Sequence, residues 1–429
     1  MKYIIATLGC KVNQYEAQAM ETLLRAAGHS PADSGAADAV IVNTCAVTAE
    51  STRKARQLIR RLRGENPRAV LAVCGCFSQL EPEAVRALGA DLVGGSDGRA
   101  AFIRTLLAAA NGGDAAPGEA VPAPPGADRR FELLPAGAAQ GRTRAYLKIQ
   151  DGCDNFCAYC VIPYARGRSR SLPLADCTTQ AAGLAARGFA EIVVTGIEIA
   201  SYGRDLPGAP ALIDAVDAVA AAAPASRLHL GSLEPRVVTR AFCQRLAALT
   251  VCRHFHLSLQ SGCDATLRRM GRRYDTAGFG KAVTLLREYF PGCGLTADLI
   301  VGFPGETEAE FAETLAFIES CRFSAMHIFP YSPRPGTRAA AMADTLPRAV
   351  KAERAARAKA LAGAMEDRYL QSCVGVRLSV LFETEKDGVC VGHGDNYREV
   401  SVSGTQLRGL VGNVEITGVR DKMLVGDFV

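Results

Sequence analysis

Long hydrophobic runs are missing from this 429-residue chain. No stretch of 18 or more apolar residues is uninterrupted, which excludes a conventional membrane-spanning helix. The opening residues, MKYIIATLGCKVNQ, reach Lys11 and Asn13 before they could form the apolar centre of a signal peptide. Tryptophan is absent too, in a composition that is otherwise typical of a soluble globular protein. We therefore expect a cytoplasmic protein with no membrane partner.

A strong excess of one charge is also missing. The net charge is only +5, so the molecule as a whole does not have the character of a general polyanion binder. Its basic residues are nevertheless clustered, in TRKARQLIRRLR (52–63), YARGRSRS (164–171) and RRMGRRY (268–274). Any one of these runs could be a solvated helix face, but three together favour RNA. The residues that we expect to contact RNA are Arg60, Arg61, Arg166, Arg168 and Arg170.

Disulfide-type cysteine spacing is the third absence. The 15 cysteines are spread over a long chain without an export signal, whereas disulfide frameworks are typical of short secreted domains. We therefore interpret them as reduced thiols, some of which are available to bind metal.

The length predicts about three domains, at about 150 residues each. Short apolar runs alternating with helical segments predict a parallel α/β sheet domain over 1–110. An Ala-, Pro- and Gly-rich stretch over 111–142 predicts a linker. Six further strand-like runs separated by helical patterns predict a complete or partial (β/α) barrel over 143–370. Short β-branched strands with glycine-containing turns predict a small all-β domain over 371–429.

Three closely spaced cysteines directly follow the first predicted barrel strand. Cys153, Cys157 and Cys160 form the pattern C-x3-C-x2-C, without a fourth cysteine nearby. Structural zinc prefers four ligands in paired knuckles, so a zinc site is the weaker alternative. Three thiolates fit a 4Fe–4S cluster in which the fourth iron is left open to another ligand. Barrel enzymes place their chemistry at this end of the strands, so we predict the active site here.

A second group of cysteines lies in the N-terminal domain. Cys10, Cys45 and Cys76 each follow a predicted strand, and parallel strands would gather them at one sheet edge. Any one of them could be a small buried hydrophobe. Cys74 is an alternative to Cys76, but we expect it to lie deeper on the same face of the strand. The three strand-end cysteines predict a second cluster, again without an obvious fourth ligand.

The cysteine pattern and its position resemble the radical S-adenosylmethionine (SAM) superfamily. The resemblance implies that the open iron binds the amino and carboxylate groups of SAM, and that Tyr159 lies near the adenine. TGIEIASYG (195–203) is similar to the superfamily's segment after the second strand, with Gly196 allowing close approach and Glu198 meeting the methionine ammonium. SLEP (232–235) and LQSG (259–262) supply the remaining predicted contacts, which are Ser232, Glu234 and Gln260.

Over the whole chain, the sequence resembles the radical SAM methylthiotransferases. The resemblance implies two 4Fe–4S clusters, a C-terminal TRAM-like domain, an electron donor such as flavodoxin or ferredoxin, and iron–sulfur assembly machinery. GCKVNQYE, LKIQDGCDNFCAYC, VIPYARG and DNY are similar to the branch that modifies N6-threonylcarbamoyladenosine next to the anticodon of tRNA. A site lined by Arg166, Arg168 or Arg170 would suit that carboxylate, whereas an isopentenyl group needs an apolar pocket.

Four alternatives remain open on the sequence alone. Two are methylthiotransferases of isopentenyladenosine in tRNA and of ribosomal protein. The others are a non-catalytic iron–sulfur redox protein and a zinc-bound RNA-binding module. The C-terminal segment from Ser372 carries 6 Lys and Arg against 8 Asp and Glu, which weakens the expectation that this domain holds RNA by charge.

Overall fold

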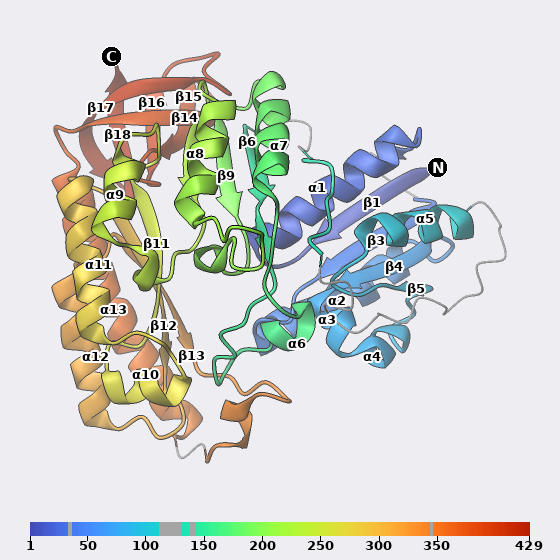
Figure 1. Cartoon of the computed structure of the whole chain (residues 1–429), viewed down its shortest axis with the longest axis horizontal. Coiled ribbons are helices and arrows are strands. Elements are labelled where there is room, and N and C mark those ends of the chain that lie inside the picture. The colour runs from blue at the N-terminus through green and yellow to red at the C-terminus, as the bar shows by residue number, and fades with distance from the viewer. Residues whose placement is uncertain (33–36, 111–129, 138–142, 344–345) are drawn as a thin grey trace.

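The computed structural model describes residues 1–32, 37–110, 130–137, 143–343 and 346–429. Figure 1 shows three bodies: a blue N-terminal sheet domain, a central set of strands wrapped by helices, and a red β barrel at one end of those strands. This arrangement confirms the predicted fold class. In the described residues, no helix is both long enough and apolar enough to cross a membrane.

The N-terminal domain is a five-stranded parallel sheet in the order β2-β1-β3-β4-β5. The strands are β1 (Lys2–Thr7), β2 (Ser30–Pro31), β3 (Ala39–Thr44), β4 (Val70–Gly75) and β5 (Leu92–Val93). The helices are α1 (Lys11–Ala26), α2 (Ala49–Glu65), α3 (Cys76–Leu80), α4 (Pro82–Arg86) and α5 (Arg99–Ala110). β3 is buried along its whole length, because separate apolar clusters cover the two faces of the sheet.

The central domain contains six parallel strands that curve into a partial barrel. They are β6 (Arg144–Lys148), β9 (Glu191–Thr195), β10 (Arg227–Leu230), β11 (His254–Gln260), β12 (Gly294–Val301) and β13 (Ala325–Pro330). Backbone hydrogen bonds join the strands in two groups, β6-β9-β10 and β11-β12-β13, and the bridges Leu228–Val251 and Leu233–Leu257 connect the two halves. Among the described strands, β6 and β13 are the two edges, so the barrel is open on one side.

Helices cover the outside of these strands. They are α7 (Leu174–Ala186), α8 (Leu212–Ala222), α9 (Arg240–Ala247), α10 (Asp264–Met270), α11 (Thr276–Tyr289), α12 (Glu308–Cys321) and α13 (Arg348–Ser372). Short elements complete the domain: β7 (Gln150–Asp151), β8 (Arg170–Ser171), α6 (Ile162–Arg166), η1 (Ile199–Ser201), η2 (Pro235–Val237) and η3 (Arg338–Ala341). β7 and β8 pair with each other and bracket the loop that carries Cys153, Cys157 and Cys160.

The C-terminal strands form a closed barrel in the order β14-β15-β16-β18-β17. They are β14 (Arg377–Lys386), β15 (Val389–Gly394), β16 (Glu399–Ser403), β17 (Val411–Arg420) and β18 (Met423–Phe428). The barrel covers the end of the central domain where the parallel strands begin. There Arg227 donates to the backbone oxygens of Ser379 (2.7 Å) and His393 (2.9 Å), and Arg253 pairs with Asp395 at 2.7 Å.

The predicted linker at 111–142 falls mostly on residues 111–129 and 138–142, which lie outside the described residues. Residues 130–137 contain neither helix nor strand, yet they are held in place. The backbone oxygen of Leu134 accepts hydrogen bonds from Tyr15 (3.1 Å) and Gln180 (3.0 Å). This short segment therefore packs between the N-terminal and central domains.

A buried ion network joins these two domains. Glu16 of α1 pairs with Arg99 (2.8 Å), Lys148 (3.3 Å) and Arg166 (2.8 Å). Asp151 pairs with Lys148 (2.8 Å) and Arg166 (3.0 Å). Each of these side chains is at most 4% exposed. Charges this deeply buried are tolerated only when they are paired, so the network fixes the position of α1 on the central domain.

Candidate active site

The loop that carries Cys153, Cys157 and Cys160 is fixed by the backbone. Cys153 donates its N–H to the oxygen of Gly167 at 3.0 Å, and Ala158 bonds to Met270 and Ala339 on either side, both at 2.8 Å. Gly152 has a φ of +70°, and a Cβ there would lie 1.9 Å from the Arg168 oxygen. Only glycine fits this position, so the loop begins in one defined direction.

Hydrogen-bond donors point at the sulfurs of this triad. The N–H groups of Asn155 and Ile162 donate to the sulfurs of Cys153 and Cys160, both at 3.5 Å. Burial raises the pKa of both thiols to about 12. A bound cation is therefore required to hold them as thiolates, and the donors would then stabilise the sulfur charge.

Arg272 is a functional candidate that the sequence did not single out. It lies in the run RRMGRRY, which we attributed to RNA binding. The structure buries its side chain, which is 6% exposed, and its Nη1 donates to Cys157 Sγ at 3.1 Å. Its other nitrogen lies 3.8 Å from Glu234. Arg272 therefore connects a cysteine sulfur to a predicted SAM contact, which a count of basic residues could not reveal.

Glu198 faces the same cysteine loop. Its carboxylate accepts from Asn155 Nδ2 at 2.9 Å and from the Ala200 N–H at 3.2 Å. Burial and the nearby charge of Glu234 raise its pKa to about 7. Gly196, at the end of β9, lies so close to the chain that a Cβ would be 2.8 Å from the Gln150 oxygen. This strand end therefore brings a carboxylate and a closely packed glycine backbone beside the triad.

The remaining predicted SAM contacts lie at neighbouring strand ends. Ser232 is exposed after β10, while Glu234 is buried and pairs with Arg236 at 2.6 Å. Gln260 ends β11 at an irregularity of the strand pairing, in the left-handed region at φ 69°. Tyr159 packs edge-on to Phe303, with ring centres 6.4 Å apart. These residues lie at the same end of the barrel strands. Their contacts with SAM stay a prediction.

Cys10, Cys45 and Cys76 lie at the ends of consecutive strands of the N-terminal sheet, as predicted. Cys10 caps α1, Cys45 follows β3, and Cys76 begins α3 directly after β4. A Cβ at Gly9 would lie 3.0 Å from Cys45 Sγ, so the first two loops touch. Asn13 Nδ2 holds them together by donating to the oxygens of Leu8 (2.8 Å) and Thr44 (3.0 Å).

The position of Cys74 differs from our expectation. We predicted that it shares a face with Cys76, but Cys74 packs in the apolar cluster under α1 and α5, whereas Cys76 packs in the cluster on the other face. The reason is Gly75, whose φ of +107° turns the chain out of the strand, so that the two-residue repeat ends there. The choice of Cys76 over Cys74 is consistent with this placement.

The two triads approach one another across one apolar layer. Cys153 and Cys160 pack against the same cluster that contains Cys76. Besides burial, the neighbouring thiols of Cys157 and Cys76 contribute to the raised pKa of Cys160. Among the described residues, no three His, Cys, Asp or Glu side chains already converge in metal-binding geometry. The fit of a cluster to either triad therefore rests on the thiol chemistry and the loops that carry the thiols.

Two of the predicted RNA contacts are wrong in this structure. Arg166 is fully buried in the ion network and also donates to Asn13 Oδ1 at 2.8 Å. The Arg170 side chain is 5% exposed and pairs with Asp97 at 2.9 Å. A guanidinium without exposed surface cannot contact a phosphate. The positive charges of these two arginines are instead paired with carboxylates inside the protein. Arg168 differs, because its side chain is 74% exposed.

A cavity of about 750 Å³ lies where the three domains meet. Its lining comes from the start of α1, from the ends of β9 and β10, from the inner faces of β11, β12 and β13, and from the β15–β16 turn. These residues include Cys10, Lys11, Gly196, Ser232, His254, His256, Thr296, Asp298, His327, Asn396, Tyr397 and Arg398. Most carry polar side chains, so the cavity is suited to a polar ligand. It also connects a cysteine of the N-terminal triad with two predicted SAM contacts.

One wall of this cavity is a hydrogen-bonded chain. His229 and His254 are joined at 2.8 Å, and Thr296 bonds to both His254 (2.9 Å) and His256 (3.0 Å). His256 then reaches Asp298 at 3.3 Å. Burial lowers the pKa of His229 to about 4 and that of His254 well below its usual value. These two imidazoles are therefore neutral at neutral pH and add no charge to the cavity.

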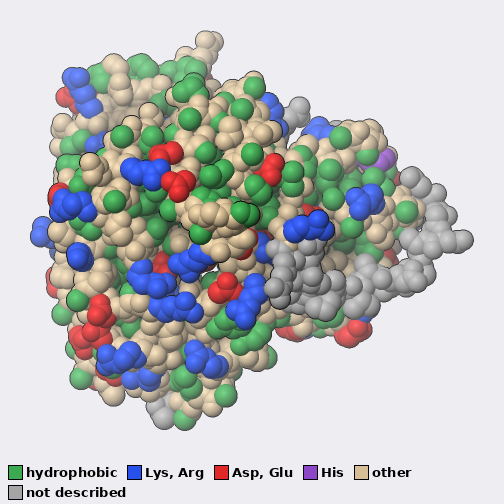
Figure 2. All heavy atoms as spheres, in the orientation of Figure 1, with side chains coloured by type: hydrophobic (Ala, Val, Ile, Leu, Met, Phe, Trp, Pro, Cys, Tyr) green, Lys and Arg blue, Asp and Glu red, His purple; other side chains and the backbone are tan. Residues whose placement is uncertain are grey.

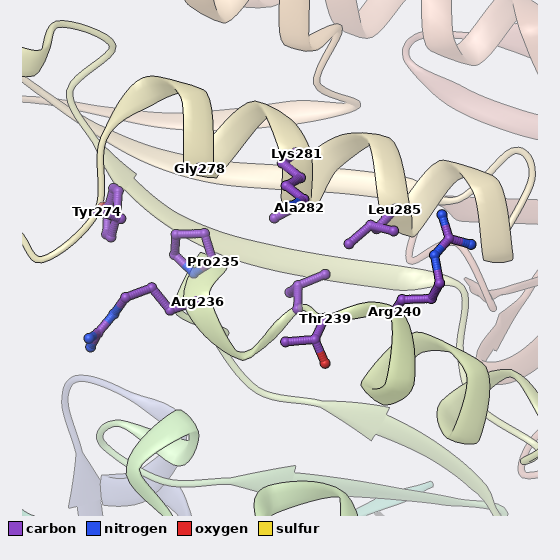
Figure 3. A pocket seen from close by; sticks show the side chains of 10 residues that line it. Pro235, Arg236, Thr239, Arg240, Tyr274, Gly278, Lys281, Ala282 and Leu285 are labelled. Carbon is purple, nitrogen blue, oxygen red and sulfur yellow. The ribbon is translucent and has the colours of Figure 1, made fainter.

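A smaller cavity of about 400 Å³ lies outside the partial barrel. Figure 3 shows its two walls, with Pro235, Arg236, Thr239 and Arg240 on one side and α11 on the other. Arg236 and Arg240 are paired with Glu234 and Glu288. No cysteine lines this cavity, so we assign the chemistry to the larger one.

Comparisons with known proteins agree with this geometry. A model of the radical SAM superfamily matches residues 147–318, and a model described as "Uncharacterized protein family UPF0004" matches residues 2–95. Among solved structures, the radical SAM methyltransferase TsrM from Kitasatospora setae aligns with a TM-score of 0.59 and 16% identity, covering 91% of this chain and 80% of its own. At that identity the likeness shows the fold.

Curated relatives align over nearly the whole chain. The threonylcarbamoyladenosine tRNA methylthiotransferase MtaB of Bacillus subtilis is 36% identical, covering 99% of this chain and 95% of the relative. The protein of the same name from Thermotoga maritima is 38% identical, over 92% and 89%. The tRNA-2-methylthio-N(6)-dimethylallyladenosine synthase of Geobacter sulfurreducens is 33% identical, over 100% and 98%. This chain, with its two cysteine triads and its partial barrel, belongs to the radical SAM methylthiotransferase family.

Proposed function

We propose that this enzyme converts N6-threonylcarbamoyladenosine next to the anticodon of tRNA to its 2-methylthio derivative. Relatives at 36% and 38% identity carry that activity in their names. The observation that carries the proposal is the polar lining of the three-domain cavity. A threonylcarbamoyl group brings a carboxylate, a hydroxyl and amide groups, which need polar partners, whereas a dimethylallyl group could use none of the hydrogen-bonding groups in the lining.

The family implies SAM and one 4Fe–4S cluster, and we assign both to the barrel. We propose that Cys153, Cys157 and Cys160 hold this cluster, and that Cys10, Cys45 and Cys76 hold a second one. When bound, these groups supply the SAM-derived radical, the sulfur and the methyl group. The chain's own contribution is positional: the N–H groups of the cysteine loop and Arg272 orient the sulfurs.

Glu198 is proposed to receive the methionine ammonium of SAM. Its raised pKa of about 7 means that much of it is protonated near neutral pH when no cation is present. An ammonium placed beside it favours the carboxylate, so binding and deprotonation are coupled. Gly196 keeps the adjoining backbone open, while Ser232, Glu234, Gln260 and Tyr159 would contact the rest of SAM.

The RNA is proposed to lie across the basic face that borders the cysteine loop. Figure 2 shows Lys and Arg side chains gathered over the lower half of the view, around α10. Arg168 and Arg273 both hydrogen-bond to Asp154, within that loop, at 3.1 and 3.2 Å, and both are exposed. Arg60 and Arg61 are exposed on α2. We further propose a TRAM-like role for the C-terminal barrel, a flavodoxin or ferredoxin as electron donor, and loading by iron–sulfur assembly machinery.

Deleting the gene should remove the 2-methylthio derivative of N6-threonylcarbamoyladenosine from cellular tRNA. The unmethylthiolated nucleoside should rise by the same amount, since it is the substrate. Mass spectrometry of digested tRNA measures both, and re-expression of the enzyme should restore the product. Loss of a methylthiolated dimethylallyladenosine instead would assign the chain to the activity named for the Geobacter relative.

Replacing Arg60 and Arg61 together by Gln should weaken tRNA binding and reduce its salt dependence by up to about two units of slope. Both side chains are exposed, and the ion pair of Arg61 with Glu65 is long, at 3.8 Å. Binding measured across a salt series gives the slope. Arg63 is a matched control on the same helix, because it bonds to the backbone of Gly89 and Ala69 and should act through stability. An unchanged slope in the double variant would assign Arg60 and Arg61 to a solvated helix face.

A further inference from the structure

Lys11 lines the three-domain cavity directly beside Cys10. It is the first residue of α1, and its ammonium lies 5.8 Å from the centre of the Tyr397 ring, which belongs to the C-terminal domain. The pair therefore connects the GCKVNQYE and DNY segments across the cavity, although the two are far apart in the sequence. Two segments from different domains thus form one end of a single binding space.

The ammonium of Lys11 differs from the other charges in the lining. Arg398 pairs at 2.6 Å with Glu366, a carboxylate that it shares with Lys422, and Asp298 lies 3.3 Å from His256. Lys11, by contrast, forms no ion pair within 4 Å in the described part of the chain: Glu191 attracts it from a greater distance and is itself paired with Arg227 at 2.8 Å, while its Tyr397 contact is with an aromatic face. A cation in a confined space without a paired carboxylate favours an anionic ligand.

The start of α1 adds to this preference. Lys11 and Val12 both line the cavity, and no side chain caps the helix at Cys10. The N–H groups of a first helical turn have no partner within the helix, and the helix dipole places partial positive charge there. A carboxylate at Lys11 would thus meet an ammonium and open backbone donors together.

Tyr397 is held rigidly opposite Lys11. It has a φ of 62°, which is unusual for a non-glycine residue, and its ring stacks on His254 with centres 4.7 Å apart. The adjacent Asn396 is buried, and Asp395 pairs with Arg253 at 2.7 Å. The turn is therefore docked on the central strands, and its tyrosine limits where the lysine side chain can move.

We propose that Lys11 binds the carboxylate of the threonylcarbamoyl group and so selects the modified adenosine. This inference rests on the proposed function. It adds the residue that recognises the threonylcarbamoyl group of the substrate. Because Lys11 adjoins Cys10, anchoring the carboxylate at Lys11 places the attached adenine close to the N-terminal triad. A dimethylallyl group offers no anion to this position, so it would leave the lysine without an anionic partner in the cavity.

The test uses the full-length, cluster-loaded enzyme and two anticodon stem–loop RNAs. One carries N6-threonylcarbamoyladenosine, and the other carries its methyl ester, which removes the negative charge. Wild-type enzyme should prefer the acid by about 10- to 100-fold in kcat/KM, chiefly through KM, in keeping with one charge-assisted contact. Lys11→Met should lose that preference and keep its rate on the ester. Lys11→Arg should retain most of it, and Lys386→Met, at an exposed lysine of β14 in the C-terminal barrel, should behave as wild type.

Two further measurements keep the outcome interpretable. Binding of both RNAs, measured without turnover, should show the same acid preference in wild type and its loss in Lys11→Met. Iron content of each variant shows whether the change beside Cys10 has cost a cluster. If wild type methylthiolates neither RNA but accepts a dimethylallyl RNA, the proposed function and this inference both fail. The inference alone is overturned if wild type acts on the acid but Lys11→Met does not change the acid preference. That would be the outcome if its kcat/KM fell by the same factor on acid and ester, or on neither.

Discussion

Cys45→Ala enzyme should still cleave SAM to 5′-deoxyadenosine under strong reductant, while forming no detectable methylthiolated nucleoside. The reason is the separation of the triads: Cys45 follows β3 of the N-terminal sheet, whereas the proposed SAM-binding cluster lies on the barrel loop. Cys157→Ala should lose both products, because it removes a ligand from the loop where SAM is proposed to bind. Chromatography of 5′-deoxyadenosine and mass spectrometry of the RNA measure the two outcomes.

Iron content provides the control for these variants. The parent should bind about eight irons, four per cluster, and each single-cysteine variant should retain about half. Cys177→Ala is a suitable reference, since this thiol is buried in the barrel's apolar core. Loss of both products in Cys45→Ala, with the barrel cluster spectroscopically intact, would contradict the division of labour. Normal methylthiolation in that variant would exclude the N-terminal triad from the chemistry.

Glu16→Gln should destabilise the protein by about 3–5 kcal/mol, which is the usual cost of removing one partner from a buried ion pair. Glu16 is 1% exposed and forms ion pairs with Arg99, Lys148 and Arg166. Denaturant unfolding measures the change. Glu21→Gln is the matched control on the same helix, because its pair with Arg25 is partly exposed and should contribute less than about 1 kcal/mol.

The same network predicts a loss of stability in acid. Burial alone would raise the pKa of Glu16, but Arg166, Arg99 and Lys148 hold it well below its usual range. A carboxyl whose pKa is lower in the folded state stabilises the protein above its unfolded pKa of about 4.3, and that stabilisation is lost as the pH falls below it. Glu16→Gln should therefore flatten the acid side of the stability profile. An equal acid dependence in both proteins would show that other groups dominate.

The strands and the cysteine positions were predictable because they depend on local pattern. Runs such as AVIVNT and HFHLSLQ coincide with β3 and β11, and cysteines after parallel strands lie at one edge. β18 was not predicted, since MLVGDF alternates too briefly to stand out. The sequence could not show which side chains pair with one another in the folded protein. Arg166 and Arg168 are two residues apart in one basic run, yet one is fully buried and the other is 74% exposed.

The cavity was unpredictable for a related reason. Its lining joins Lys11, residues in or next to five central strands and Tyr397, and only the docking of three domains brings them together. Arg272 likewise acquires its role from the approach of α10 to the cysteine loop, where Met270 bonds to Ala158 at 2.8 Å. Long-range packing of this kind leaves no periodic signal in the sequence.

The Glu16 network also sets an order for events on the ribosome. Glu16 leaves the exit tunnel 132 residues before Lys148 and 150 residues before Arg166. Until then the nascent N-terminal sheet holds a carboxylate whose partners, apart from Arg99, have not been made. Within its own domain α1 already packs against β1, β3 and α5, but docking of that domain on the barrel must await translation of the cysteine loop, which supplies the remaining partners of Glu16. The apolar layer that Cys76 shares with Cys153 and Cys160 is thus completed only in this late step, when the first domain and the barrel come together.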